Sequence, residues 1–332
     1  MNLKETKEIF RSIQKLLEFS TPGTPMYKAS LECLNELKNE IRSLLPTKPN
    51  MINYTIINSA LNAVIPKPMS KEILYTIHNA GFFSNSTIRL MDIVNYFNRN
   101  GKLPDEVDSS VQWLHYKSYP GDRLDTFYFE TEQPAEGFGP VDSPYITTDC
   151  MAIQFHPYFN IKFDQLKPFV DKYFVPGKPV KDVLRLYENK YNLDYANLCA
   201  VFYRGNSKFR EMTIASYDYF IDKAKEVKAQ HPNMKFLVQP DEREFLEAFL
   251  QAFPNDTIYF TETPMINKQD SDNFFELPLD KRKEQGTNFF AALLAISKCH
   301  TVITHSGNCG LWTALYRGNA TNLHQIFNNE WL

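Results

Sequence analysis

Short apolar runs alternate with stretches of helical periodicity through the second half of the chain. The runs span residues 198–203, 235–238, 257–260 and 301–304, and the periodic stretches span 213–229, 241–252, 287–297 and 309–317. Such runs are typical of buried strands, and such stretches are typical of amphipathic helices. Strands separated by helices of this length predict a parallel sheet, in which ligands bind outside the carboxyl ends of the strands.

The first half shows the same order less clearly. Residues 72–78 are typical of a strand, a polar turn at 79–86 leads into a helix, and residues 110–115 predict the next strand. A β-turn-α-β start of this kind is expected of a doubly wound α/β domain. Residues 116–160 are irregular and rich in Pro, Gly, Tyr and Asp, a composition that favours a binding loop, and a helix at 180–190 leads into the second half.

Two stretches with apolar faces precede both halves, at residues 4–18 and 27–45. The pair predicts a helical hairpin that serves packing or dimerisation. A protein whose main role is assembly through this hairpin remains an alternative.

Composition and charge narrow the class of protein. The 332 residues are 43% hydrophobic, enough for a large core, and the net charge of −3 provides no basic field for nucleic acid. The aromatic share of 14% is expected to fill the core first. The N-terminus lacks the apolar segment of a signal peptide, and no run approaches the roughly 18 apolar residues of a membrane span. We therefore expect a soluble, cytoplasmic protein with no transmembrane segment.

The chain has five cysteines, an odd number, with no Cys-x-x-Cys pair. This usage disfavours a disulfide framework or a zinc site and favours a reducing compartment. Cys199 and Cys299 lie within or beside apolar runs and are expected to be buried thiols.

A cationic segment follows the predicted strand at 198–203. Arg204 offers a bidentate fork for a phosphate, and Lys208 adds a point charge. Gly205 permits a close approach of the backbone. Because ligands bind at the carboxyl ends of such strands, we interpret the segment as a phosphate site rather than a turn with two solvated cations.

A second candidate site is the end of the strand at 301–304 with the start of the next helix. It consists of Thr304, His305, Ser306, Gly307 and Asn308. The free N–H groups and the dipole of a helix start favour an anion. Helix capping by Ser306 or Asn308 is the alternative.

Asp241 is a third candidate, because it follows the strand at 235–238. A carboxylate there suits ribose hydroxyls or a base N–H, and capping of the following helix is an equal alternative. A fourth and weaker candidate, an acceptor or phosphate turn, consists of Gly81, Phe82, Phe83 and Ser84.

Several common motifs do not occur in the sequence. It has no GxGxxG, no GxxxxGK[ST], no GxSxG and no HExxH. Asp270 and Asp272 form an acid-x-acid pattern that suits a divalent metal, but they lie in a polar loop expected at 262–285, which favours a solvated loop.

These candidate residues resemble those of the fucosyltransferase-like glycosyltransferases. Residues 201–211 are similar to the family's strand that ends in His/Tyr-Arg-Gly/Arg-Thr-Asp-Lys, and residues 236–242 resemble its strand that ends in Thr-Asp-Asp/Glu. Residues 299–308 resemble its late strand and serine-rich turn, and residues 81–85 its early turn.

The resemblance implies the GT-B architecture, an α/β fold of two facing Rossmann-like domains. We expect a helical extension at 1–48, an acceptor-side domain at 49–180 and a nucleotide-sugar-binding domain at 181–332. The implied reaction is an inverting, metal-independent transfer of a sugar, with fucose favoured, from a nucleotide-diphosphate sugar to a glycan hydroxyl. The family's Thr and Asp are Asn206 and Ser207 here, which leaves open a GDP-linked donor or a UDP-linked one such as UDP-xylose.

The resemblance also implies roles for single residues. Arg204 and Lys208 would bind the donor diphosphate, Asp241 the nucleoside, and residues 304–308 the phosphates. Glu211 would be the catalytic base.

The donor is then a substrate, and no separate cofactor or metal is expected. An oligosaccharide or glycan acceptor and a homodimer through the N-terminal helices complete the expected partners. Asp92, Asp122 and Asp149 remain alternative bases. A non-catalytic nucleotide- or glycan-binding module remains the alternative from another class.

Overall fold

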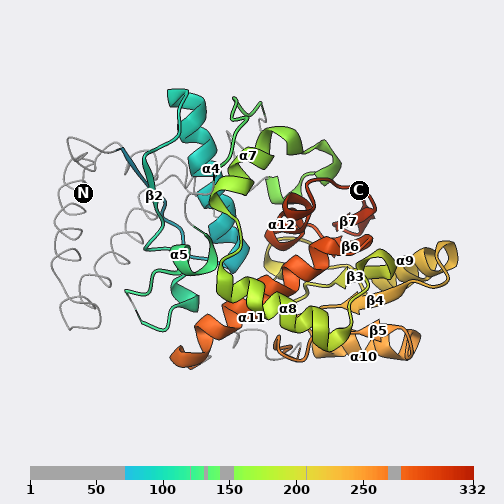
Figure 1. The fold of residues 1–332 in the computed structure, drawn as a ribbon. Helices are drawn as coiled ribbons and strands as arrows, with labels where there is room; N and C mark the ends of the chain where they lie inside the picture. Colours follow the sequence, from blue (N-terminus) through green and yellow to red (C-terminus); the bar gives the residue numbers. More distant parts are fainter. Residues whose placement is uncertain (1–71, 120, 131–133, 143–152, 207, 268–277) are drawn as a thin grey trace. The chain divides into compact units, whose positions relative to one another are not determined.

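A computed structural model describes most of the chain from residue 72 onward. The described residues are 72–119, 121–130, 134–142, 153–206, 208–267 and 278–332 (Figure 1). The expected helical hairpin, Cys33, Cys150, Asp149 and the Asp270–Asp272 pattern lie outside them. Contacts divide the chain into two compact units, residues 1–125 with 144–151 and residues 126–143 with 152–332. The expected boundaries at 48/49 and 180/181, and the facing of two domains, stay predictions.

The first unit contains a small β-α-β arrangement. Strand β1 (Ile73–Tyr75) pairs in parallel with β2 (Glu106–Asp108), and helix α4 (Phe82–Asn100) connects them. Helix α4 ends at Gly101, whose φ of 65° allows its N–H to reach the carbonyl of Phe97. The expected strand and helix are therefore confirmed, but the predicted polar turn at 79–86 is too long.

The strand predicted at 110–115 is wrong. The second strand of this unit lies earlier, at β2, and Leu114–Tyr116 form a short 3₁₀ helix, η1. Trp113 has a φ of 56°, which interrupts an extended backbone. Its buried indole N–H donates to the carbonyl of Phe82 at 3.1 Å, so the apolar residues here face a helix rather than forming a strand.

The second unit is built on a parallel sheet. Its six described strands lie in the order β5-β4-β3-β6-β7-β8, and only β8 runs antiparallel to its neighbour. The strands are β3 (Leu198–Phe202), β4 (Lys235–Val238), β5 (Thr257–Ile258), β6 (Thr301–His305), β7 (Leu323–Phe327) and β8 (Glu330–Trp331). The chain thus runs outward from β3 to β5 and then returns to the other side of β3, as in a Rossmann-type sheet.

Helices accompany this sheet in the second unit. They are α7 (Phe163–Tyr173), α8 (Lys178–Tyr191), α9 (Tyr217–Gln230), α10 (Arg243–Ala252), α11 (Leu279–Lys298) and α12 (Asn308–Arg317). The short helix α5 (Leu124–Tyr128) has residues in both units. Short 3₁₀ helices are η2 (Ile153–Phe155), η3 (Tyr158–Asn160), η4 (Tyr195–Asn197) and η5 (Lys208–Arg210). Figure 1 shows α8 and α11 side by side, in agreement with their many contacts.

Aromatic side chains fill one face of the sheet, as the composition indicates. Tyr203, directly after β3, stacks on Phe245 of α10 with ring centroids 4.2 Å apart, and Phe220 of α9 meets its edge at 5.1 Å. These side chains belong to one buried cluster with Cys199 and Phe236 of the strands. The rigid packing fixes where β3 ends and the cationic segment begins. Cys199 and Cys299 are buried free thiols, as predicted.

Three elements of the second unit depart from the expectation. Helix α7 lies directly after the segment interpreted as irregular, and it contains Pro168, a residue that argues against a helix in the sequence. Helix α11 begins at Leu279, inside the predicted loop. The sequence indicated a loop there because the first turns of the helix are polar and exposed. Strand β7 was not predicted, since His324 and Gln325 interrupt its apolar pattern.

Candidate functional site

The two predicted phosphate segments of the second unit meet at one edge of the sheet. The strand order reverses between β3 and β6, and the register pairs Phe202 with Thr304. The residues that follow these strands are therefore neighbours. Ligands of Rossmann-type sheets bind in this place, outside the carboxyl ends of the two central strands.

Arg204 is held at the end of β3 by contacts with two other strand ends. Its Nε lies 3.3 Å from Oδ2 of Asp241, and its backbone N–H donates to Nδ1 of His305 at 3.3 Å. Asp241 Oδ1 also accepts from the N–H of Gly205 at 2.8 Å. Burial raises the pKa of Asp241, against the lowering effects of the Arg204 charge and the N–H donors. Asp241 therefore orients the arginine, a contact that the sequence alone did not indicate.

Position 205 has room only for a glycine, because the side chain of a neighbouring residue lies against it. A Cβ atom there would overlap the carboxylate of Glu242. Glu242 is buried and accepts from the Tyr217 hydroxyl at 2.7 Å, so it has little freedom to move. The close approach expected at Gly205 is thus made by Glu242. The capping role considered for Asp241 is not seen either, because Glu242 is the N-cap of α10 and no side chain of the described residues caps it.

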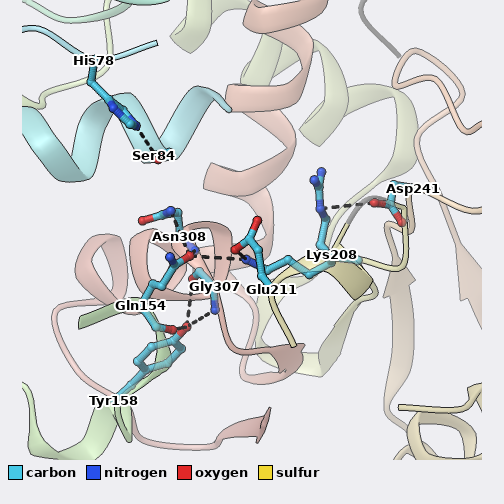
Figure 2. A network of polar contacts seen from close by, with 10 residues as sticks. His78, Ser84, Gln154, Tyr158, Lys208, Glu211, Asp241, Gly307 and Asn308 are labelled. Atoms are coloured by element: carbon cyan, nitrogen blue, oxygen red, sulfur yellow. Dashed lines mark hydrogen bonds and ion pairs between the residues drawn. The ribbon is translucent and has the colours of Figure 1, made fainter. Parts of the chain in front are cut away.

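Lys208 extends from the β3 segment to the start of α12. Its Nζ lies 2.6 Å from Oε2 of Glu211 and 3.3 Å from Oε1 of Gln154 (Figure 2). A Cβ on Gly307 would lie 2.9 Å from this Nζ, so the ammonium rests directly against the helix start. The structure therefore brings together Lys208 and the segment 304–308, as the sequence predicted.

Two side chains from residues 153–160 bind the start of α12. Gln154 Oε1 accepts from the backbone N–H of Asn308 at 3.2 Å, and the Tyr158 hydroxyl accepts from the N–H of Gly307 at 2.9 Å (Figure 2). Gly307 is the N-cap, and no side chain of the described residues provides the usual cap. The capping considered for Ser306 or Asn308 is therefore wrong. Instead, Ser306 Oγ accepts from Gln325 Nε2 at 2.7 Å.

His305 is a buried, neutral part of the same site. Burial, and to a smaller extent the charges of Lys208 and Arg204, lower its pKa to about 3. Its ring packs on Phe220 and Tyr203, with centroids 4.6 and 4.9 Å away. Because Nδ1 accepts a hydrogen bond, the single proton of the ring is assigned to Nε2. Thr304 is also buried in the strand, with its hydroxyl donating to the carbonyl of His305 at 3.2 Å.

The candidate turn of the first unit is part of a helix. Gly81 is the exposed N-cap of α4, whereas Phe82 and Phe83 are buried. Ser84 Oγ lies 2.8 Å from Nε2 of His78. Phe82 donates its N–H to the hydroxyl of Tyr116 at 3.1 Å, so the first turn of this helix is bound from inside the unit.

The alternative bases lie in the first unit. Asp92, on α4, and Asp122 are both buried there. Lys117 is buried near Asp125 and Asp122, and burial lowers its pKa to about 8 in spite of these carboxylates. Arg123 binds Asp125 through Nε and Nη2 at 3.0 and 2.9 Å. Lys117, Asp122 and Asp125 are buried within the first unit, whereas Arg123 is exposed.

The described residues contain no cluster of three or more His, Cys, Asp and Glu side chains placed to hold a metal ion. Across the same part of the chain, no helix has the length and apolarity needed to cross a membrane.

Sequence reasoning missed the residues that surround the cations. Gln154, Tyr158 and Gln325 are all buried and all bind the predicted site residues. Gln154 and Tyr158 lie in a stretch without periodicity, and Gln325 lies in an unpredicted strand. The sequence indicated only that residues 116–160 favour a binding loop, without naming these side chains.

The comparisons with known proteins give structures but no sequence families. No family model matches the chain, and no curated protein matches it. The chain is similar to NodZ α-1,6-fucosyltransferase co-crystallized with GDP, with 12% identity and a TM-score of 0.48 over 80% of this chain and 98% of that chain. Fucosyltransferase NodZ from Bradyrhizobium gives 13% identity and a TM-score of 0.45, over 78% of this chain and 100% of that chain. A mutant of Arabidopsis thaliana FUT1 in complex with GDP gives 11% identity and a TM-score of 0.38, over 96% of this chain and 78% of that chain.

These structures are fucosyltransferases, the family that the sequence motifs resemble. The likeness is distant, so we infer the function from the chain's own residues.

Proposed function

We propose that the protein is a glycosyltransferase that uses a nucleotide-diphosphate sugar, with a fucosyl donor favoured. The observation that carries this proposal is the meeting of Arg204 and Lys208 with the segment 304–308, at the ends of β3 and β6. Two cations and a helix start at this place suit the two phosphates of a nucleoside diphosphate.

The chemistry follows from the charge that develops during transfer. The bond between the sugar and the diphosphate breaks, and the leaving diphosphate gains negative charge. Arg204 and Lys208 are positioned to stabilise that charge, as fixed cations do in other transfer reactions. Asp241 keeps the guanidinium in place, and the segment 304–308 adds N–H groups. This arrangement supports a reaction that needs no metal, and full activity in EDTA is the expected result.

Glu211 is the proposed base. It would take the proton of the acceptor hydroxyl while that oxygen attacks the sugar carbon from the opposite side, which inverts the anomeric centre. Its side chain is 44% exposed, and its carboxylate lies 2.6 Å from Lys208 Nζ. A diphosphate that binds Lys208 weakens this ion pair, which frees the carboxylate for the acceptor.

The Glu211→Gln variant tests the catalytic assignment. We expect sugar transfer to fall by about 10²–10⁴-fold, the usual contribution of a general base, while donor binding stays within about twofold. The measurement is release of free nucleotide from GDP-fucose and from UDP-xylose, with an added glycan acceptor. Glu226→Gln is the matched control, because Glu226 forms the same i,i+3 ion pair with Lys223 on the exposed face of α9.

Full transfer by Glu211→Gln would reject Glu211 as the base and direct attention to Asp92 and Asp122. Nucleotide binding without release from any donor would favour the alternative of a non-catalytic binding module. Preference for the UDP-linked donor would replace the fucosyl assignment and leave the class of enzyme unchanged.

A further inference from the structure

Three hydrogen-bond donors converge on one oxygen atom of the protein itself. Gln154 Oε1 lies 3.2 Å from the backbone N of Asn308, 3.0 Å from Asn308 Nδ2 and 3.3 Å from Lys208 Nζ (Figure 2). The donors come from two strand ends, since Lys208 follows β3 and Asn308 opens α12 after β6. An ammonium and a helix start bind an anionic oxygen more strongly than a neutral amide oxygen.

The other end of the same carboxamide is poorly satisfied. Gln154 Nε2 is buried and has no hydrogen-bond partner among the described residues. A buried amide N–H without an acceptor is unfavourable. The carboxamide is therefore held in place by its oxygen alone, and an oxygen with a stronger attraction for the same donors would displace it.

Gly307 allows the cation to approach the helix start. Its φ is 147°, and a Cβ there would lie 2.8 Å from Cε and 2.9 Å from Nζ of Lys208. The absence of a side chain brings the ammonium beside the first helical N–H groups. The position of Gln154 Oε1 is therefore within hydrogen-bond distance of both the Lys208 ammonium and the backbone N–H of Asn308 at the helix start.

We propose that this point is a subsite for a phosphoryl oxygen, and that Gln154 competes with the diphosphate for Lys208 and Asn308. The inference rests on the proposed function and assigns to Gln154 a part in setting the donor affinity. A phosphoryl oxygen carries the charge that the amide oxygen lacks. When it takes these donors, the carboxamide of Gln154 moves away and its nitrogen is no longer buried without an acceptor.

Inorganic pyrophosphate is the probe for this subsite, titrated by calorimetry into the full chain. Gln154→Met removes the competing oxygen at similar volume, so we expect pyrophosphate to bind about threefold to tenfold more tightly, the worth of about one hydrogen bond. Gln154→Glu places a carboxylate on Lys208, and we expect binding at least about tenfold weaker.

Gln112→Met is the matched control. Gln112 is a buried glutamine of the first unit, and its side chain has no hydrogen-bond partner among the described residues. Its substitution is expected to leave pyrophosphate affinity near the wild-type value. Thermal unfolding gives a second measurement. Gln154→Met should have a lower Tm without pyrophosphate, because the hydrogen bonds to Gln154 Oε1 are lost, and a larger rise in Tm with pyrophosphate.

Several results would overturn the inference. Weaker pyrophosphate binding by Gln154→Met would make Gln154 itself a ligand, and unchanged binding would remove the subsite from this point. If the wild type binds pyrophosphate, either of these two results rejects only the proposed competition by Gln154. The proposed function would then still stand. Failure of the wild type and every variant to bind pyrophosphate would reject the proposed function as well.

Discussion

His305 places a neutral side chain at a site that otherwise gathers positive charge. Burial lowers its pKa to about 3, and Lys208 and Arg204 contribute in the same direction. Its Nδ1 accepts the backbone N–H of Arg204, so the imidazole fixes the arginine without repelling it. His305 thus supports Arg204 from the core, and the phosphate contact that the sequence suggested at this position stays a prediction.

The lowered pKa of His305 predicts a pH dependence of stability. In the unfolded chain a histidine titrates near pH 6.5, so below that pH the unfolded state binds a proton that the native state does not. The free energy of unfolding therefore falls as the pH is lowered from about 6.5 toward 3, by up to about 1.4 kcal/mol per pH unit from this group. Above about pH 6.5 the group is neutral in both states and contributes no slope.

The His305→Gln variant tests this prediction by urea unfolding at several pH values from 7 to 4. Glutamine keeps an acceptor but does not titrate, so the variant should lose less stability on acidification than the wild type. His324, whose pKa burial also lowers, adds a slope of the same sign to both proteins. If the free energy of unfolding fell equally with pH in wild type and variant, His305 would bind its proton as readily in the native protein as in the unfolded chain. That result would contradict the prediction.

At the scale of one element, the start of α12 is ordered by residues far away in the sequence. The Tyr158 hydroxyl lies 2.9 Å from both the N and the O of Gly307, and 3.0 Å from the carbonyl oxygen of Gln154. Helix starts have N–H groups without partners inside the helix. Tyr158 therefore takes the place of the missing side-chain cap and keeps the helix start beside Lys208.

Tyr158→Phe is expected to lower the free energy of unfolding by about 1–3 kcal/mol. The substitution leaves the buried N–H of Gly307 without its acceptor, which has a cost of this order. The measurement is urea unfolding monitored by circular dichroism. Tyr219→Phe on α9 is the control, since Tyr219 is 43% exposed. Equal losses in the two variants would mean that Tyr158 does not order the helix start.

Elements also show how far the sequence alone can predict this fold. Strand β4 was predicted with its observed bounds, because Lys235–Val238 is a short apolar run between clear turns. Strand β7 was not predicted because it contains polar side chains such as Gln325, which donates a hydrogen bond to Ser306. The segments 204–208 and 304–308 were predicted to face each other because each follows a strand at the ligand edge of the sheet. The contact of Gln154 with α12 was not predicted, since no local pattern places residues 153–155 beside that helix.

At the scale of the second unit, the order of strands explains why the site lies where it does. The reversal between β3 and β6 brings two strand ends together, and Asp241 after β4 lies close enough to bind both Arg204 and Gly205. Three separate segments of sequence thus contribute polar or charged groups to one edge. Sequence reasoning located these segments because each directly follows an apolar run, and their mutual contacts followed only from the packed sheet.

A calorimetric titration of GDP and UDP into the wild type and Arg204→Ala tests the proposed site most directly. The wild type should bind at least one of them, and Arg204→Ala should bind it at least about tenfold more weakly, the loss expected for one charge-assisted contact. Arg185→Ala, which removes an exposed arginine of α8, should bind like the wild type. Equal affinity of wild type and Arg204→Ala would contradict a diphosphate site at the end of β3.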